Sequence, residues 1–448
     1  MNKAGKILIS ATVVVALAAA GVTGWKYWDE SNTLLVDGIQ YDRSMSLLDL
    51  REENISLPHY LNLQEAFPGR EILWSVPFQR RSYASDTKKI TVTSLTKEDV
   101  KQLELLPELQ YVDARNCFDY EALQALRAAK PQCIVDSCVA IAGKIYPYDT
   151  EKLEFAEGQE DFEELLRKLA YLPSLKEVHF TEPTLTPQEL QELEKTFAEV
   201  TFTWDKTLFG KHLSRDTKTL DISGRKFKSI EDVKAQTDYL PELTKLTMCN
   251  TGLPYDDIAA FRERSSFKVI FNVRIRDFDV RTDAVWFMPS KFGKEVRDCD
   301  MRNLKYCEDM QYVDLSRNVV KNVDWVRGTP HLKYLVIKES PLRDLQFLRD
   351  AKELRLLEIS NTDLRELEPL QGCTALEDLN LSGFLGDISA LREMDWLQNL
   401  WAIGGDSLKN QLPDTNIHGS NEGGWKQLKN NREMQELLEK RGPTLIKK

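Results

Sequence analysis

Hydrophobic residues in the C-terminal half of this chain recur with a period of 22 residues. Met310, Leu332, Leu354 and Leu376 are each 22 residues apart, and Leu397 follows 21 residues later. Each of these residues opens a short stretch in which every second residue is apolar, as in M-Q-Y-V-D-L and L-K-Y-L-V-I. Alternation of this kind predicts a short strand with one buried face, and a fixed period in this range predicts a solenoid.

The turn that begins at Met310 has the spacing L-x-x-L-x-L-x-x-N-x-L, with Asn318 at the asparagine position. After it, two further apolar positions recur in each turn and predict a second, convex side. They are Val323, Leu345, Leu367 and Ile388, and then Val326, Leu348, Leu370 and Leu391. Over residues 306–405 this pattern resembles bacterial leucine-rich repeat proteins, most closely the internalin-like class. The resemblance departs at the asparagine position, where Ser340, Thr362 and Phe384 follow Asn318.

A longer period links the first 300 residues to this repeat. Pro107, Pro173 and Pro241 lie 66 and 68 residues apart in similar phrases, and an Asp recurs every 67 residues at positions 149, 216 and 283. Sixty-seven residues are about three turns, so residues 45–305 are predicted to form super-repeats of three turns each. Helical patterns near 120–130, 187–197 and 255–264 fit the backs of such turns.

These periods predict an α/β leucine-rich repeat solenoid of roughly 16–17 turns. We expect a curved parallel sheet on its concave face and helices or 3₁₀ turns on its convex face, in one continuous solenoid. The chain is divided into five segments. They are an N-terminal signal anchor or signal peptide (1–25), a linker with a first strand (26–44), the super-repeats (45–305), the 22-residue repeats (306–405) and a C-terminal cap (406–448). In the cap, a helix carrying Trp425, Leu428, Met434, Leu437 and Leu438 is expected to cover the final turn. A small docking element for a partner is the alternative.

The N-terminal segment contains 18 uncharged residues at positions 7–24, preceded by Lys3 and Lys6. This run is just long enough to span a bilayer, and Trp25, Tyr27 and Trp28 follow it as an interfacial aromatic belt would. A retained anchor is favoured over a cleaved signal peptide, whose cleavage site would lie near the alanines at 18–20. Either interpretation sends the rest of the chain out of the cytoplasm, as a single-pass cell-membrane protein or a secreted one.

Composition and motifs narrow the chemistry. The formal net charge of -11 argues against a nucleic-acid partner. The seven cysteines include no C-x-x-C pair, so no metal site and no cofactor is predicted. The five histidines are far apart, and no nucleophile, zinc or phosphate-binding motif occurs. The protein is therefore predicted not to be an enzyme, although a carboxylate pair that meets only in space stays open as an alternative.

The concave face offers recognition instead of catalysis. Its outward strand positions mix aromatic and charged residues, a composition typical of interface hot spots. The candidate ligand-binding residues are Tyr312, Asp314, Tyr334, Lys338, Glu358, Asp378, Asn380 and Trp401. We expect a monomer that binds a protein or glycan in adhesion, envelope organisation or host contact. A structural spacer without a specific ligand is the alternative, and an enzyme or inhibitor built on the solenoid is a more distant one.

Overall fold

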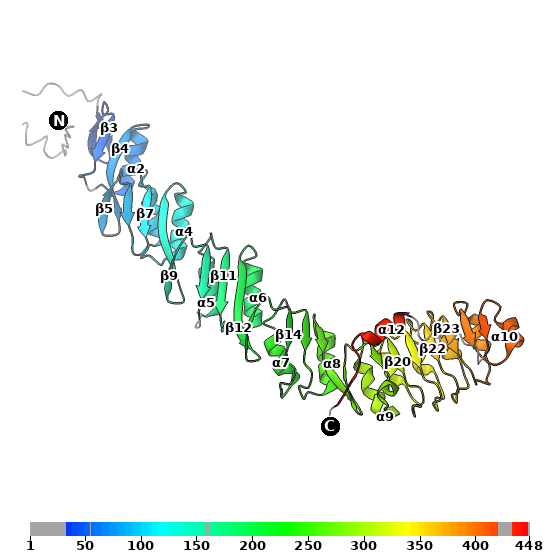
Figure 1. The fold of residues 1–448 in the computed structure, drawn as a ribbon. Coiled ribbons are helices and arrows are strands. Elements are labelled where there is room, and N and C mark those ends of the chain that lie inside the picture. Colours follow the sequence, from blue (N-terminus) through cyan, green and yellow to red (C-terminus); the bar gives the residue numbers. More distant parts are fainter. Residues whose placement is uncertain (1–32, 54, 157–160, 420–431, 447–448) are drawn as a thin grey trace, which may run out of the picture. The chain divides into compact units, whose positions relative to one another are not determined.

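The computed structural model describes residues 33–53, 55–156, 161–419 and 432–446 (Figure 1). The predicted N-terminal anchor or signal segment lies outside these residues. None of the helices within the described ranges is both long and apolar enough to cross a membrane. The chain divides into two compact units, Met1–Asp205 and Lys206–Lys448, and each is described separately.

The first unit is built of modules, each of which alternates parallel strands with helices and ends in a β-hairpin. Its helices each place apolar residues against a sheet, and they are α2 (Leu57–Ala66), α3 (Lys97–Glu104), α4 (Tyr120–Ala129), α5 (Phe162–Leu169) and α6 (Pro187–Thr196). Its strands are β1 (Thr33–Val36), β2 (Ile39–Asp42), β3 (Leu47–Leu50), β4 (Glu71–Phe78), β5 (Arg81–Ala84), β6 (Lys89–Thr91), β7 (Tyr111–Ala114), β8 (Ile134–Ile141), β9 (Lys144–Pro147), β10 (Lys152–Phe155), β11 (Glu177–Thr181) and β12 (Thr201–Leu208). Strands separated by a helix pair in parallel, as in β6-β7-β8 and β10-β11-β12.

Local sequence explains where the helices begin. Thr96 and Thr186 cap α3 and α6 in capping boxes, in which each hydroxyl accepts from a backbone N–H of the first turn. Pro187 occupies the first turn of α6, where its missing N–H costs no hydrogen bond. Leu190 and Leu193 then bury one stripe of that helix.

The long period marks a β-hairpin at the end of each module, which the sequence analysis missed. Strand β8 continues past its parallel partner and turns back into the antiparallel strand β9. Both central residues of this turn, Ala142 and Gly143, have positive φ angles of 47° and 72°, which suits a hairpin turn. Asp149, one of the aspartates that recur every 67 residues, follows the hairpin, and the hydroxyl of the next residue, Thr150, donates to the Pro147 carbonyl oxygen at 2.7 Å.

The expectation of one continuous sheet is therefore wrong. The parallel strands of the described chain fall into separate sheets, and in the first three modules the return strand of the hairpin (β5, β9 or β13) is the last strand of its sheet. A hairpin also replaces the expected first strand near residue 35. There, β1 and β2 pair antiparallel around Asp37-Gly38, a dipeptide typical of such turns.

The second unit begins with one more module and continues into the regular repeat. The module comprises β13 (Lys211–Ser214), β14 (Thr219–Asp221), α7 (Ile230–Thr237), β15 (Lys245–Thr247), α8 (Tyr255–Arg264), β16 (Lys268–Ile270), β17 (Asn272–Ile275) and β18 (Phe278–Arg281). The first elements after it are β19 (Trp286–Phe287), η2 (Pro289–Phe292), α9 (Asp298–Met301) and η3 (Arg302–Tyr306).

The 22-residue repeats form a seven-stranded parallel sheet in the order β19 to β25. Its other strands are β20 (Tyr312–Asp314), β21 (Tyr334–Val336), β22 (Leu356–Glu358), β23 (Asp378–Asn380), β24 (Asn399–Trp401) and β25 (Asn416–His418). A 3₁₀ helix follows each strand from β20 to β23, namely η4 (Asp324–Gly328), η5 (Gln346–Leu348), η6 (Glu368–Gly372) and η7 (Ser389–Glu393). These short backs fit the apolar positions that the sequence placed on the convex side.

The asparagine position forms a partial ladder. Asn318 is buried, and its Oδ1 accepts from the Val296 N–H at 2.7 Å. One turn later the Ser340 hydroxyl donates to the Asn318 carbonyl oxygen at 2.7 Å. Thr362 turns instead to the Ile359 carbonyl oxygen of its own turn, at 3.0 Å. Small hydroxyls thus replace part of what a continuous row of amides would supply.

The C-terminal segment folds back on the seven-stranded sheet. After α10 (Gly405–Gln411) and β25, its described part comprises α12 (Arg432–Glu439) and β26 (Thr444–Leu445). Helix α12, red in Figure 1, packs on side chains of β19 to β22. Strand β26 pairs antiparallel with β18, at the opposite end of the repeats from β25. The sequence had instead assigned this helix to the final turn.

Candidate functional site

The two faces of the seven-stranded sheet carry separate hydrophobic clusters. The inner row faces the 3₁₀ helices and includes Val313, Leu335, Leu357, Leu379 and Leu400, which stand in register on successive strands. Side chains alternate between the faces along a strand, so the residues on either side of this row point the opposite way. That opposite face is the concave face of the predicted repeat, and all the candidate binding residues lie on it.

A group of apolar side chains on the concave face, called the aromatic face below, forms a cluster of its own. It consists of Trp286, Tyr312, Tyr334, Val336, Leu356 and Trp401. The rings of Tyr312 and Tyr334, on adjacent strands, meet edge to face with centroids 6.4 Å apart. At one margin Trp286 stacks on Phe292, and at the other Trp401 stacks on His418 with centroids 4.4 Å apart.

Helix α12 covers the aromatic face. Its Met434 and Leu437 side chains are 1% and 2% exposed within this cluster, and Leu438 packs against it. These three apolar residues are spaced i, i+3 and i+4, which places them on one side of the helix. Tyr312 and Tyr334, beneath α12, are consequently only 2–3% exposed, and Trp401, which stacks on His418, is 2% exposed. The expectation of an open ligand face is corrected: these rings are buried, and the two tyrosines lie beneath the chain's own C-terminal segment.

Polar contacts hold the segment that follows α12. The Trp286 Nε1–H donates to the Lys440 carbonyl oxygen at 3.1 Å, and the Val285 N–H donates to the Arg441 carbonyl oxygen at 2.9 Å. The Arg441 guanidinium lies 3.5 Å from Asp283. Burial raises the pKa of Asp283, but the hydrogen bonds and charge of Arg281 and the charge of Arg441 outweigh it and hold the pKa below the ordinary value.

The charge pattern of α12 matches the strand beneath it. Lys333 Nζ, just before β21, lies 3.8 Å from a carboxylate oxygen of Glu433. Burial raises the pKa of Tyr334, and a hydrogen bond to Glu433 raises it further. On the neighbouring strand, burial and the charge of Asp314 raise the pKa of Tyr312, whose hydroxyl donates to Asp314 at 3.3 Å. Both phenols therefore stay neutral and donate to carboxylates.

The remaining candidate residues flank the aromatic face. Asp314, Glu358 and Asn380 are buried in one row with Val336 and Trp401, and Lys338 and Asp378 are half-buried. Asp378 accepts a hydrogen bond from Asn399 at 2.8 Å, and burial raises its pKa. The structure thus places all eight candidates on one sheet face. It brings the three aromatic ones into a single cluster, and the covering helix is the component that sequence reasoning did not place there.

In the first unit, by contrast, charges on the equivalent strand positions are paired with one another. Asp49 and Arg51 form an ion pair at 2.8 Å, and Asp113 and Arg115 repeat it in the next module, also at 2.8 Å. The Arg115 hydrogen bonds lower the pKa of Asp113 to about 2. His179, on β11, bonds through Nδ1 to the Thr203 hydroxyl at 2.9 Å. At these positions the described strands of the first unit present paired charges and polar groups instead of the aromatic rings found on β19 to β24.

An Asp–His–Tyr relay in the first module escaped the sequence analysis. His59 Nδ1 lies 2.7 Å from Asp37 Oδ2, and its Nε2 lies 2.8 Å from the Tyr41 hydroxyl. Such an order occurs in catalytic relays, but here both His59 and Tyr41 are buried and Tyr41 packs edge to face on Phe67. The relay therefore ties the β1–β2 hairpin to α2.

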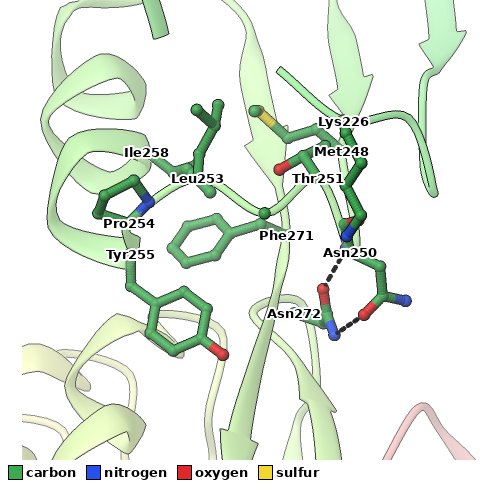
Figure 2. Close-up of a pocket in the computed structure, with 11 residues that line it drawn as sticks. Lys226, Met248, Asn250, Thr251, Leu253, Pro254, Tyr255, Ile258, Phe271 and Asn272 are labelled. Carbon is green, nitrogen blue, oxygen red and sulfur yellow. Dashed lines mark hydrogen bonds between the residues drawn. The ribbon is translucent and has the colours of Figure 1, made fainter. Parts of the chain in front are cut away.

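A hollow of about 440 Å³ lies in the module before the repeats, where β16 and β17 pass the start of α8 (Figure 2). On one side Asn272 bonds to Asn250 twice, through its Oδ1 and its Nδ2, and the Lys226 ammonium donates to the Asn250 carbonyl oxygen at 2.9 Å. Leu253, Pro254 and Phe271 form much of the rest of the lining. Asn250, Asn272 and Lys226 are thus paired with one another, whereas the buried Thr251 hydroxyl of the lining has no hydrogen-bond partner among the described residues. The lining holds no carboxylate, imidazole or thiol that could act as an acid, base or nucleophile.

Metal ligands do not converge in the described ranges, where no group of three or more His, Cys, Asp or Glu side chains could hold an ion. The seven cysteines are free thiols, and all except Cys138 and Cys299 are buried. Burial raises the pKa of Cys307 and of Cys373 to about 12, so both thiols are protonated at neutral pH. The concave face of the repeats is therefore the candidate functional site.

The parallel strands, their 22-residue spacing and the 3₁₀ helices behind them define a leucine-rich repeat solenoid. Among solved structures, an internalin from Listeria monocytogenes is 14% identical, has a TM-score of 0.24 and covers 73% of this chain and 85% of its own. A second Listeria monocytogenes internalin, C2, is 15% identical with a TM-score of 0.22, covering 58% and 79%. A leucine-rich repeat protein of Leptospira interrogans is 15% identical with a TM-score of 0.26, covering 73% and 75%.

Neither a protein-family model nor a curated protein matches the chain. The TM-scores of the structural neighbours are also low. The assignment to the leucine-rich repeat fold therefore rests on strand register and repeat spacing within the chain itself.

Proposed function

We propose that this chain is a protein-binding leucine-rich repeat protein and that the aromatic face of β19 to β24 is its binding surface. The observation that carries the proposal is that this face already holds an amphipathic helix. Two-turn helices are not stable alone in water, since isolated helices shorter than about 12–15 residues are marginal. The eight residues of α12 are therefore held in helical form by the face beneath them.

The chemistry of the face favours a protein over a glycan. Desolvated aromatic side chains in the centre of an interface, with polar groups around them, are typical of protein hot spots. Burying Met434 and Leu437 contributes about 1.5–3 kcal/mol each by transfer values. An apolar stripe laid on such a face is the usual helix-in-groove mode of recognition.

Photo-cross-linking tests the surface. A benzophenone amino acid at Lys338, half-buried on the concave face, should cross-link a protein partner in intact cells. The same group at Arg327, exposed on the 3₁₀ side, is the matched control and should not. Equal cross-linking from both positions, or none from Lys338, would contradict the proposed surface.

We further propose that the repeats act outside the cytoplasm, tethered or released through residues 1–25. The support is the uncharged run at 7–24, the two lysines before it and the aromatic residues after it. Mass measurement of the mature N-terminus distinguishes a retained anchor from a cleaved signal peptide. Protease digestion of intact cells provides the second test, because repeats that resist digestion until the cells are lysed would refute the location.

A further inference from the structure

Resting on the proposed binding surface, we propose that residues 432–446 are a displaceable intramolecular competitor for it. The partner inferred is a protein that presents an amphipathic helix with apolar residues at i, i+3 and i+4 and an acidic residue just before them. Such a helix repeats the pattern of Glu433, Met434, Leu437 and Leu438. It would take the place of α12, and the released segment would leave the sheet intact.

The attachment of the segment is confined to a few side chains. Only Met434 and Leu437 of α12 are fully buried. Beyond the helix, the contacts to Val285 and Trp286 use backbone carbonyl oxygens of the segment, and β26 adds a ladder of two residue pairs to β18. Two side chains also take part: the Arg441 guanidinium lies 3.5 Å from Asp283, and the Thr444 hydroxyl donates to the Asp279 carbonyl oxygen at 3.1 Å. Within α12 itself, the contacts that a partner helix can copy are those of the apolar stripe.

The sheet beneath does not depend on α12 for its own core. The inner row and the 3₁₀ helices belong to a separate hydrophobic cluster, and the strands are hydrogen-bonded to one another throughout β19 to β25. Release of α12 removes contacts from only one face. Free α12 is too short to keep its helix, so the released segment is unfolded and presents no competing groove.

The aromatic face is also larger than α12. Strands β19 to β24 are separated by five steps of about 4.8 Å, or roughly 24 Å in all. The eight residues of α12 extend about 12 Å at 1.5 Å per residue. A partner helix of roughly 16 residues laid across the strands would extend past α12 over the half-buried Asp378 and Asn399 of β23 and β24. Those added contacts are how a separate molecule overcomes the local concentration of a tethered competitor, which is of order millimolar for a short linker.

Charge completes the match. Lys333 meets Glu433 at the margin of the face, and both side chains remain partly exposed, at 27% and 46%. Exposed pairs of this kind are screened by salt and steer association more than they stabilise it. An acidic residue at the equivalent position of a partner helix would meet the same lysine.

The experiment uses the full-length chain and a fluorescein-labelled peptide of residues 432–446 as the probe. Peptide binding is measured by anisotropy for the wild type, for Leu437→Asp and for the matched control Gln435→Asp. Both substitutions add one negative charge to α12, but Leu437 is buried and Gln435 is exposed. We expect Leu437→Asp to bind the peptide at least tenfold more tightly than wild type, since its own segment no longer competes. Gln435→Asp should match wild type.

Hydrogen–deuterium exchange keeps the test decisive. In Leu437→Asp, residues 432–446 should exchange faster while strands β20 to β24 stay protected. If the segment is released and the peptide still binds no more tightly than to wild type, the proposal is overturned. Should the charge disrupt the sheet, the uncharged change Gly442→Ala replaces it in the same assay. Wild-type exchange as slow in α12 as in β21 would also overturn displacement.

Failure of the competitor and failure of the binding function have different outcomes. If Lys338 cross-links a partner but the peptide does not bind Leu437→Asp, the proposed binding function stands and the competitor proposal fails. If the peptide binds Leu437→Asp tightly but no partner is cross-linked, the aromatic face is an internal docking surface and the proposed binding function fails.

Discussion

Replacing Gly442 by alanine should loosen the C-terminal segment without adding charge. A Cβ on Gly442 would lie 2.1 and 2.2 Å from Cε2 and Cζ2 of the Trp286 ring. The ring has little freedom to move away, because it is buried, stacks on Phe292 and donates to the Lys440 carbonyl oxygen. Gly442 does not have a positive φ, so alanine is compatible with its backbone and steric overlap is the whole cost.

The size of the effect follows from two opposing terms. Overpacking of this kind costs typically about 1–3 kcal/mol. Alanine also reduces the freedom of the released chain, which offsets about 0.4–1 kcal/mol. From the middle of each range the net loss is about 1.3 kcal/mol, which should raise the open fraction of the segment roughly tenfold.

Hydrogen–deuterium exchange of the full-length chain measures this change. Amides of residues 432–446 and of Val285 should exchange faster in Gly442→Ala by about that factor, while β21 and β22 keep their protection. Lys440→Ala is the control, because its side chain is exposed and only its carbonyl contacts Trp286. Unchanged exchange at Val285 in Gly442→Ala would refute the close packing of the segment on Trp286.

Three further predictions concern stability and accessibility. Gly372→Ala should lower the free energy of unfolding of the repeats by about 1–3 kcal/mol, because the added Cβ would lie 2.1 Å from the Arg349 carbonyl oxygen. Urea titration measures the change, and an unchanged midpoint would contradict the close approach of these two turns. The lowered pKa of Asp283 contributes stability above its usual value of 3.8 that is lost as pH falls through the lowered value. Exchange of residues 432–446 should therefore rise at the acid end, and Asp283→Asn should show that rise at neutral pH and remove its acid dependence. N-ethylmaleimide at pH 8 should modify the exposed Cys299 in the folded protein. It should reach the buried Cys373, whose pKa is raised to about 12, only after unfolding. Modification of Cys373 before unfolding would mean that the core of the repeats opens.

The repeat could be predicted from sequence because each turn has the same local requirements. Leu335, Leu357 and Leu379 occupy the inward position of successive strands, and the structure places them in register as the 22-residue spacing requires. The same alternation assigned Tyr312 and Tyr334 to the opposite face correctly. A strand has only two faces, so fixing one row fixes the other.

The longer period was detected, but the hairpins that go with it were not. The units around β6-β7-β8, β10-β11-β12 and β14-β15-β16 each have three parallel strands, in line with three turns. A spacing of 67 residues is compatible with three uninterrupted turns, and also with three turns that end in a hairpin. Only the structure distinguishes them, through turns such as Ala142-Gly143 in which both residues have positive φ. Alanine and glycine at these positions do not form the Asn-Gly or Asp-Gly signal of such a turn, whereas Asp37-Gly38 does and could have been recognised.

The sequence by itself determined the solenoid, the inward rows and the sheet face on which aromatic residues gather. Tertiary structure alone decided that this face is covered. The contact between Trp286 and Lys440 joins residues 154 positions apart, and no local pattern encodes such a pairing. An amphipathic helix shows in its sequence that it needs an apolar surface, but not which one, because apolar contact has no direction of its own. Here the surface that it covers is the aromatic face of β19 to β24.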